Sequence, residues 1–392
     1  TLDRSSAASD VYKRQVLAIA AIAPTAVAQS SLSSLGSSSS SSRDSRPAAS
    51  TSTSAKPKEP QLNVRDVYSC PTPEKVQGQA SWKVYNTSGL ALTVYVADDA
   101  GNAYQVLERV GTPAKRAWAP KLQDGTYHLT CVFHNDSAVK SDDFAVTGST
   151  ITDAPKMVPI TDREVAAVAI QQAARQKKRV PELQKKAHAL AEATSKDRRA
   201  AQAAYLDYLE TYRSFDDSSE MWPGPGLEGY MDVEKLLWSK RPVKDAAKPA
   251  RALADAVDKT ARALDTSHFA IPAPDYGLRT HEVMEEFERF DMRGERDFGA
   301  HALPTALRGD VISTRLTLDA VRSLVEGRGL DTSPIYEQLD ELDNLATKFD
   351  EKYDTAFNKW SQKDRMRVQS AVARANELLA PVATMTVVRR MD

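Results

Sequence analysis

The sequence predicts a multidomain protein in which a small all-β sandwich is followed by an all-α antiparallel helical bundle. Short runs of alternating polarity, separated by turn residues, fill the chain from residue 61 to about 150. Stretches with apolar residues three and four positions apart fill the chain after residue 160. At 392 residues the chain is also long enough for two or three domains.

Composition narrows the class of protein. The chain is 41% hydrophobic and 27% charged, which is ordinary usage for a folded protein. Its 52 Lys and Arg residues nearly balance its 53 Asp and Glu residues, giving a formal net charge of -1. A general electrostatic affinity for nucleic acid is therefore not indicated, and we expect no nucleic-acid partner.

Residues 1–28 have the pattern of a secretory signal peptide. Lys13 and Arg14 precede the apolar run 16–23, and residues 26–28 have the small-x-small form of a signal-peptidase site. The apolar run is too short to span a bilayer, and no later stretch approaches that length. We therefore expect an exported protein, periplasmic or at the cell surface, with no transmembrane helix in the mature chain.

The region around this signal carries two further expectations. The chain begins with Thr1 in place of Met, so we expect its extreme N-terminus to be artefactual and its true start to be missing. Residues 29–60 are rich in Ser, with Ala, Pro and Lys, and have almost no large apolar side chains. Such a segment buries too little surface to offset the entropy of ordering, so it is expected to be a disordered linker.

The predicted β domain covers residues 61–150. Residues 80–85 alternate in polarity and 92–96 are rich in β-branched side chains, with a turn sequence at 86–89 between them. Residues 126–131 follow an Asp-Gly turn and form a further expected strand. Several short strands at regular spacing indicate a small sandwich.

The two cysteines of the chain, Cys70 and Cys131, both lie in this β domain and allow two interpretations. In an exported protein a single pair typically forms a disulfide, which would stabilise the domain by about 4 kcal/mol. Alternatively, Cys131 with His134 and nearby His128 offers thiolate and imidazole groups suited to copper. The residues alone leave both interpretations open.

The predicted helical domain covers residues 161–392. Asp162 is placed to cap a helix that carries Val165 and Val168, and the apolar period continues through Leu209. Breaks fall at 223–226 and at 327–329. The further helices are expected at 231–239, 248–264, 279–292, 311–326, 335–357 and 363–379. Long amphipathic helices with short breaks describe an antiparallel bundle.

One short segment of the bundle, Gly229–Trp238, has the form of a metal-binding helix. Residues three apart share a helix face, so His-x-x-Glu aims an imidazole and a carboxylate at one ion. Here Glu234 occupies the carboxylate position, but Met231 stands where the histidine would be. A thioether replaces imidazole poorly for iron or zinc.

These features together resemble EfeO, the periplasmic component of a bacterial iron uptake system, with a cupredoxin-like β domain and an imelysin-like bundle. The β domain is similar at Asp66-x-x-x-Cys70 and along 123–131, where the family has a Pro-Gly-x-Tyr-x-x-x-Cys strand. Gly229–Trp238 is similar to the family's Gly-Phe-His-Arg-Ile-Glu-Lys-x-Leu-Trp segment. Residues 285–301 are similar to its Glu-Glu and Gly-Glu-Glu-Asp-Arg-Tyr-Ser-His stretch, although the family's Thr-Asp-Leu-Trp-Asp-Phe is replaced at 302–307.

The resemblance implies a site and a role. The metal-site positions that it carries over are Met231, Glu234, Glu286, Glu295, Asp297, His301 and, across a gap in the alignment, Glu210. If these side chains converge, they form an oxygen and nitrogen site suited to iron, or to another divalent metal such as zinc. The implied role is capture of the ion for a membrane iron permease, with a peroxidase-type protein as a further partner.

Alternatives to this role stay open at the sequence level. The loss of the histidine at Met231 is also expected of a metal-free descendant that uses the bundle as an interaction or structural module. Imelysin-like proteins have been classed as metallopeptidases, but catalysis needs an open metal with a general base, and the histidine loss argues against an enzyme. A second pair, His281 and Glu285, lies four residues apart on a predicted helix, where a surface ion pair is the commoner role.

Overall fold

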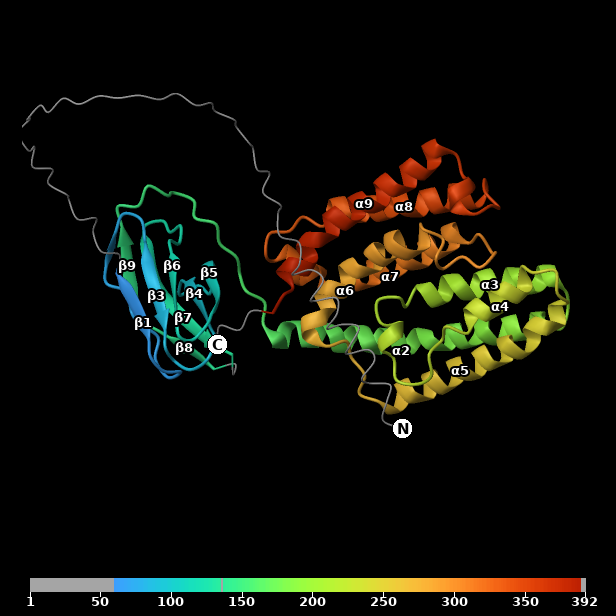
Figure 1. Cartoon of the computed structure of the whole chain (residues 1–392), viewed down its shortest axis with the longest axis horizontal. Helices are drawn as coiled ribbons and strands as arrows, with labels where there is room; N and C mark the ends of the chain where they lie inside the picture. Colours follow the sequence, from blue (N-terminus) through green and yellow to red (C-terminus); the bar gives the residue numbers. More distant parts are fainter. Residues whose placement is uncertain (1–59, 135–136, 389–392) are drawn as a thin grey trace, which may run out of the picture. The chain divides into compact units, whose positions relative to one another are not determined.

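The computed structural model describes residues 60–134 and 137–388. The predicted signal peptide, 1–28, and residues 29–59 of the predicted linker lie outside the described residues. Within the described residues, a β region of two sheets is followed by an all-α region of eight helices, as the sequence predicts (Figure 1). The last strand ends at Thr147 and the first described helix begins at Asp162.

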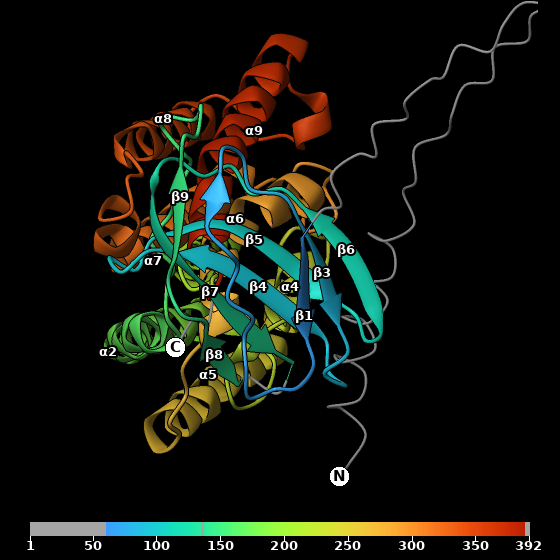
Figure 2. The same cartoon turned by 90° about the vertical axis from the view of Figure 1, so that its left-hand side faces the viewer.

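The β region contains a three-stranded sheet, in the order β1-β3-β6, and a six-stranded sheet. The larger sheet has the order β2-β9-β7-β4-β5, and β8 also pairs with β7. Figure 2 shows β3 between β1 and β6. The strands are β1 (Gln61–Val64), β2 (Val76–Gln77), β3 (Trp82–Asn86), β4 (Leu92–Ala97), β5 (Ala103–Val110), β6 (Ala114–Trp118), β7 (Gly125–Phe133), β8 (Ala138–Lys140) and β9 (Phe144–Thr147).

Strand β7 organises the larger sheet because it pairs with β4, β8 and β9. Its side chains Tyr127, Leu129 and Cys131 point into the core between the sheets, where Trp82 packs against the rings of Trp118 and Phe144. Cys131 is bonded to Cys70, with their Cα atoms 5.6 Å apart, so the disulfide prediction is confirmed. The bond ties the segment after β1 to the centre of the fold.

As described here, the all-α region contains eight helices and four short helical turns, and one of these turns, η3, is π-helical. The helices are α2 (Asp162–Ala193), α3 (Arg198–Arg213), α4 (Tyr230–Leu237), α5 (Ala247–Thr266), α6 (Ala273–Glu286), α7 (Leu303–Glu326), α8 (Ser333–Asp350) and α9 (Gln362–Met385). The turns are η1 (Ser219–Met221), η2 (Val243–Ala246), η3 (Phe287–Asp291) and η4 (Phe357–Lys359). None of the described helices is long and apolar enough to cross a membrane.

Several helix ends differ from expectation, among them the end of α8 at Asp350, where 357 was expected, and three of the differences have identifiable reasons. Helix α2 is capped by Thr161, whose hydroxyl accepts from the Glu164 N–H while the Glu164 carboxylate accepts from Thr161, so Asp162 lies in the first turn. Helix α7 begins eight residues earlier than predicted, because Pro304 occupies its first turn, where proline is tolerated. The segment predicted as one helix at 279–292 turns π-helical at η3.

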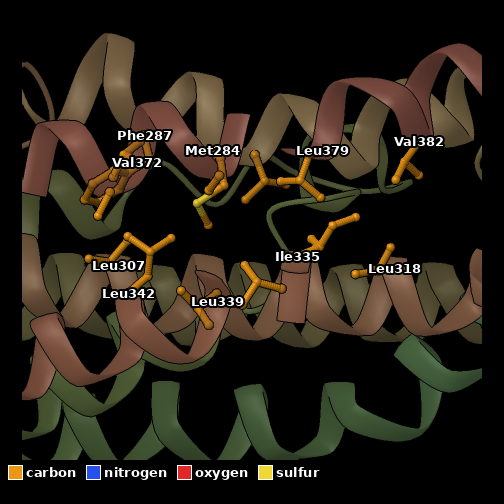
Figure 3. Close-up of a cluster of buried hydrophobic side chains, with 14 of the residues drawn as sticks. Met284, Phe287, Leu307, Leu318, Ile335, Leu339, Leu342, Val372, Leu379 and Val382 are labelled. Atoms are coloured by element: carbon orange, nitrogen blue, oxygen red, sulfur yellow. The ribbon is translucent and has the colours of Figure 1, made fainter. Parts of the chain in front are cut away.

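A large apolar cluster holds α6, α7, α8 and α9 together (Figure 3). Met284, Phe287 and Leu379 face Leu307 and Leu339 across the packed layer, and all five side chains are almost fully buried. Burial of this kind contributes about 1.5–3 kcal/mol per large apolar side chain relative to exposure. The helical period in the sequence therefore identifies these faces correctly as core.

Helices α3 and α7 lie close together at Gly309. A Cβ atom built on this residue would lie 2.7 Å from the Glu210 carbonyl oxygen and closer still to the Arg213 Cβ. Both neighbouring atoms belong to the backbone or to the base of a side chain, so neither can move without shifting the helix. Glycine at this position permits the contact.

We expect Gly309→Ala to destabilise the helical region by about 1–3 kcal/mol, because the added methyl group overpacks the α3–α7 contact. The measurement is the free energy of unfolding in denaturant. Gly229→Ala is a matched control, since the nearest atom to its added Cβ is the Leu253 Cδ1 at 3.9 Å. Equal stability of the two variants would contradict the role given to Gly309.

Candidate functional site

A buried arginine, Arg213, is surrounded by carboxylates in the helical region. Its guanidinium donates to both carboxylate oxygens of Asp310, with the Nε to Oδ1 distance 2.8 Å, and to Asp291 at 3.0 Å. Burial acts to lower the pKa of Arg213, but the carboxylates of Asp216, Asp291 and Asp310 outweigh it and raise that pKa well above its usual value. Arg213 therefore stays charged and fixes α3 against α7 and η3.

Arg296 extends this network toward the surface. It donates to Glu286 at 2.9 Å and lies 3.4 Å from Asp291. Asp291 thus lies between two guanidinium groups. The π-helical turn η3 ends at Asp291 and places its side chain among them, consistent with the frequent use of such turns at specialised sites.

Glu234, the candidate ligand on α4, is 2% exposed and acts as a clamp for another segment of backbone. One carboxylate oxygen accepts from the Tyr205 hydroxyl at 2.7 Å. The other accepts from the backbone N–H groups of Phe298 and Ala300, at 2.8 and 2.9 Å. Burial raises the pKa of Glu234, and these hydrogen bonds offset part of that rise.

The clamped segment presents the second pair of candidates, Asp297 and His301. The Asp297 Oδ2 lies 2.9 Å from the His301 Nδ1, and its Oδ1 accepts from the backbone N–H groups of Gly299 and His301. His301 has a positive φ of 54°, and Gly299 has φ 130° and packs where a Cβ atom would lie 2.9 Å from the Trp238 Cβ. The loop is thus folded tightly onto α4.

The pKa of Asp297 reflects this arrangement. Burial acts to raise it, but the hydrogen bonds from the His301 ring and from the two backbone N–H groups outweigh burial, so the pKa is lowered. Asp297 is therefore an ionised acceptor at neutral pH.

A cavity of about 60 Å³ lies beside the Glu234 and Asp297 side chains. Glu234 and Asp297 both line it, so the two stretches that the resemblance identifies do converge on one place. Met231 lines a neighbouring cavity of about 140 Å³ instead and packs against the apolar cluster around α3, α4 and α5. The charged and phenolic residues of the smaller cavity are Arg213, Tyr230, Glu234, Asp291, Arg293, Arg296 and Asp297.

The remaining candidates lie outside this cavity. Glu286 is bound by Arg296, as described above, and Glu210 accepts from Arg308 at 2.9 Å. Glu295 is exposed to solvent. The structure therefore places Glu234 and Asp297 at one cavity, with His301 against Asp297, and it leaves Glu210, Glu286 and Glu295 outside that cavity.

The weaker sequence candidates are also placed. His281 lies 3.4 Å from Glu285 and 3.1 Å from the Asn376 carbonyl oxygen, consistent with an ion pair or hydrogen bond. In the β region, Cys131 is held in the disulfide and offers no thiolate, while His134 is exposed. The Cys131 and His134 set considered for copper is therefore not assembled in this oxidised form.

The described residues whose potential metal ligands lie closest to the geometry of an ion site belong to a different group, in the β region. Across residues 60–134 and 137–388, the one set of three or more His, Cys, Asp or Glu residues whose ligand atoms all lie within 4.8 Å of one another is Asp99, His128 and Asp143. The bundle candidates do not meet this criterion. Their assignment as metal ligands stays a prediction.

Sequence reasoning missed the arginines of the site. Arg213 and Arg296 each neutralise carboxylates that the resemblance offers as ligands or that lie beside them. A cation in a charged helix is usually a solvated surface residue, so the sequence gives no signal that Arg213 is 3% exposed. Tyr205, which holds Glu234, was recognised only as part of an apolar stripe.

With this geometry established, the chain can be compared with known proteins. A scan against known protein families gives no match, and a search of curated proteins finds no match in sequence.

A separate buried carboxylate, Asp217, lies between α2 and α7. Both of its oxygens accept from the Gln176 side chain, at 3.0 and 2.8 Å, and Oδ1 also accepts from Ser313 at 3.2 Å. Burial raises the pKa of Asp217 to about 6, although hydrogen bonds, including the one from Ser313, act to lower it. The Gln176 Oε1 is buried without a partner among the described residues.

We expect Asp217 to make the folded state more stable as pH falls from about 6 to about 4. Its folded pKa of about 6 exceeds the unfolded value of about 3.9, so the folded state binds the proton first in this window. The full effect is at most about 3 kcal/mol. Asp217→Asn should remove this pH dependence, because an amide side chain does not titrate. The variant should still fold, because the Gln176 amide can turn its free oxygen toward the new NH₂ group.

The measurement for Asp217 is the free energy of unfolding against pH, compared between the native chain and Asp217→Asn. Asp265→Asn, an exposed carboxylate on α5, is the control and should keep the native pH profile. Parallel profiles for the native chain and Asp217→Asn would contradict the prediction.

We expect Glu234→Ala to destabilise the protein by about 3 kcal/mol or more, because the Tyr205 hydroxyl and two loop N–H groups lose their acceptor. Glu234→Gln has the same shape and keeps an oxygen for the loop, so its loss should stay below about 1.5 kcal/mol. Denaturant unfolding gives both values, and hydrogen exchange at Phe298 and Ala300 reports the loop directly. Slow exchange at these amides in Glu234→Ala would show that the clamp is not needed.

Proposed function

We propose that this protein is an exported, non-enzymatic metal-binding protein similar to EfeO, which captures an iron ion in its bundle for a membrane permease. The observation that carries the proposal is that Glu234 and Asp297 line one small cavity, with His301 against Asp297. These residues come from the two stretches that resemble the family's metal site. The disulfide supports export, since such bonds persist in oxidising compartments.

In this proposal iron is cargo, so binding must be reversible. Glu234 and Asp297 supply carboxylate oxygens and His301 supplies an imidazole, which together suit Fe(II) or Fe(III). An arriving ion would compete with the Tyr205 and backbone hydrogen bonds on Glu234 and with the pairing of Asp297 to His301. That competition lowers the net affinity, which favours release to a permease over permanent retention.

A second function, a metal-free interaction module, is favoured by a specific observation. Each partly buried candidate carboxylate already has a partner within the protein, with Glu286 on Arg296, Glu210 on Arg308 and Asp297 on His301. The guanidinium groups of Arg213 and Arg296 also line the cavity and repel a cation. A metallopeptidase has less support, because Met231 replaces the histidine of the His-x-x-Glu pair and faces a different cavity.

We expect anaerobic Fe²⁺ titration by calorimetry to show one ion bound to the bundle, with at least roughly tenfold weaker binding in both Glu234→Gln and Asp297→Asn. Glu234→Gln removes the charge while keeping the shape, which separates ligand loss from unfolding. The matched control is Asp232→Asn, an exposed carboxylate on the same helix that pairs with Lys235. No Fe²⁺ binding tighter than about 1 mM would remove the iron proposal and leave the metal-free module.

A further inference from the structure

His128 occupies an unusual position in the larger β-sheet. Tyr127 and Leu129, its neighbours on β7, point into the core, so the alternation of the strand directs His128 to the opposite face. It is nevertheless 5% exposed. Its Nδ1 faces carboxylate oxygens of Asp99 and Asp143.

Two carboxylates face the His128 ring from the chain segments on either side of β7. On one side, Ala97 of β4 pairs with His128 in the sheet, and Asp99 follows two residues later. On the other side, Ser141 bonds to Leu129 through its backbone N–H, and Phe144 of β9 pairs with Tyr127, which places Asp143 beside His128. The sheet register therefore assembles three residues that are far apart in the sequence.

The distances suit a shared ion better than a hydrogen bond. The His128 Nδ1 lies 3.9 Å from the Asp99 Oδ1 and 3.9 Å from the Asp143 Oδ1. Both distances exceed hydrogen-bond range. Two ligands of one tetrahedral zinc ion lie roughly 3.4 Å apart, since each bond is about 2.0–2.2 Å long. Rotation of the two exposed aspartate side chains closes the difference of a few tenths of an ångström.

The turn that carries Asp99 is held in place by its neighbour. Asp98 accepts from the backbone N–H and the side chain of Asn102, at 2.9 and 2.8 Å, and from the Tyr104 hydroxyl at 3.0 Å. Asp98 is thus occupied in closing the turn between β4 and β5, while Asp99 is left facing His128. A rigid turn reduces the entropy lost when Asp99 binds an ion.

The electrostatics of the group also suit a cation. Asp98, Asp99 and Asp143 place three carboxylates around the ring, and Lys140 is the opposing positive charge among the groups that act on His128. Burial, assisted by Lys140, lowers the pKa of His128 despite these carboxylates. An imidazole nitrogen that carries no proton has a lone pair available for a metal.

We propose that Asp99, His128 and Asp143 form a binding site for a divalent cation of the zinc class on the β region. One imidazole nitrogen and two carboxylate oxygens supply three ligands, and water completes the coordination. The hard ions Ca²⁺ and Mg²⁺ take all-oxygen sites, so the buried imidazole disfavours them. Cu(I) prefers sulfur, and Cys131 is unavailable because it is in the disulfide.

This site does not rest on the function proposed for the bundle. Its residues come from strands and turns of the β region, and each proposal can fail without the other. The crossed variants Glu234→Gln in the bundle and Asp143→Asn in the β region separate them in one experiment.

The test is titration of the full chain with ZnCl₂, followed by calorimetry and by the NMR signals of the imidazole rings. We expect zinc to bind the β region and to shift the resonances of one histidine there, which disappear in His128→Gln. Asp99→Asn and Asp143→Asn should each weaken zinc binding at least tenfold, since roughly 10–100-fold is already lost on changing a group that only supports a ligand. Asp142→Asn, the adjacent exposed carboxylate, and Glu234→Gln should bind as the native chain does.

Two results would overturn the site. One is the absence of zinc binding to the native chain. The other is binding that Asp99→Asn and Asp143→Asn leave unchanged, which would place the ion elsewhere. Both aspartates are exposed, so these two variants are informative even if His128→Gln, which alters a buried side chain, fails to fold.

Discussion

The arrangement of the helical region depends on keeping the buried Arg213 guanidinium charged. An isolated buried charge is very unfavourable, so every element near Arg213 has to supply a compensating group in the right place. Helix α7 contributes Asp310 and the π-helical turn contributes Asp291, and Gly309 lets α7 come close enough for these contacts. Asp291 in turn orients Arg296. The need to neutralise Arg213 therefore helps to determine which charged side chains line the cavity beside Glu234.

A carboxylate in a motif typical of metal sites can serve a purely structural purpose. Glu234 accepts three hydrogen bonds, and two of them come from the backbone of Phe298 and Ala300, in a loop more than sixty residues later in the chain. Such a loop has few backbone partners of its own, and a buried N–H without an acceptor is costly. Glu234 can therefore hold the loop in place whether or not it also binds an ion.

Much of the fold could be predicted from the sequence because buried apolar positions recur at the period of the strand or helix that carries them. Alternation indicated the strand around Val84, β-branched side chains indicated the strand around Val94, and the Asp-Gly turn indicated the strand around Leu129. Apolar spacing indicated the helices, and the single pair of cysteines indicated the disulfide. The beginning of α7 was missed because Pro304 normally signals a break. The contacts of Arg213, the π-helical turn and the group around His128 depend on tertiary register, for which local spacing provides no signal.

The disulfide also determines how the β region responds to mechanical load. A pull on the chain at Gln61 acts first along β1, which lies parallel to β3 and must be sheared from it through all of its hydrogen bonds at once. If β1 detaches, the chain extends only as far as Cys70 before the load reaches Cys131 on β7. That is about ten residues, or roughly 35 Å of extended chain. The remaining strands are then pulled through a covalent bond at the centre of the sheet, so the core is shielded from stepwise unravelling from this end.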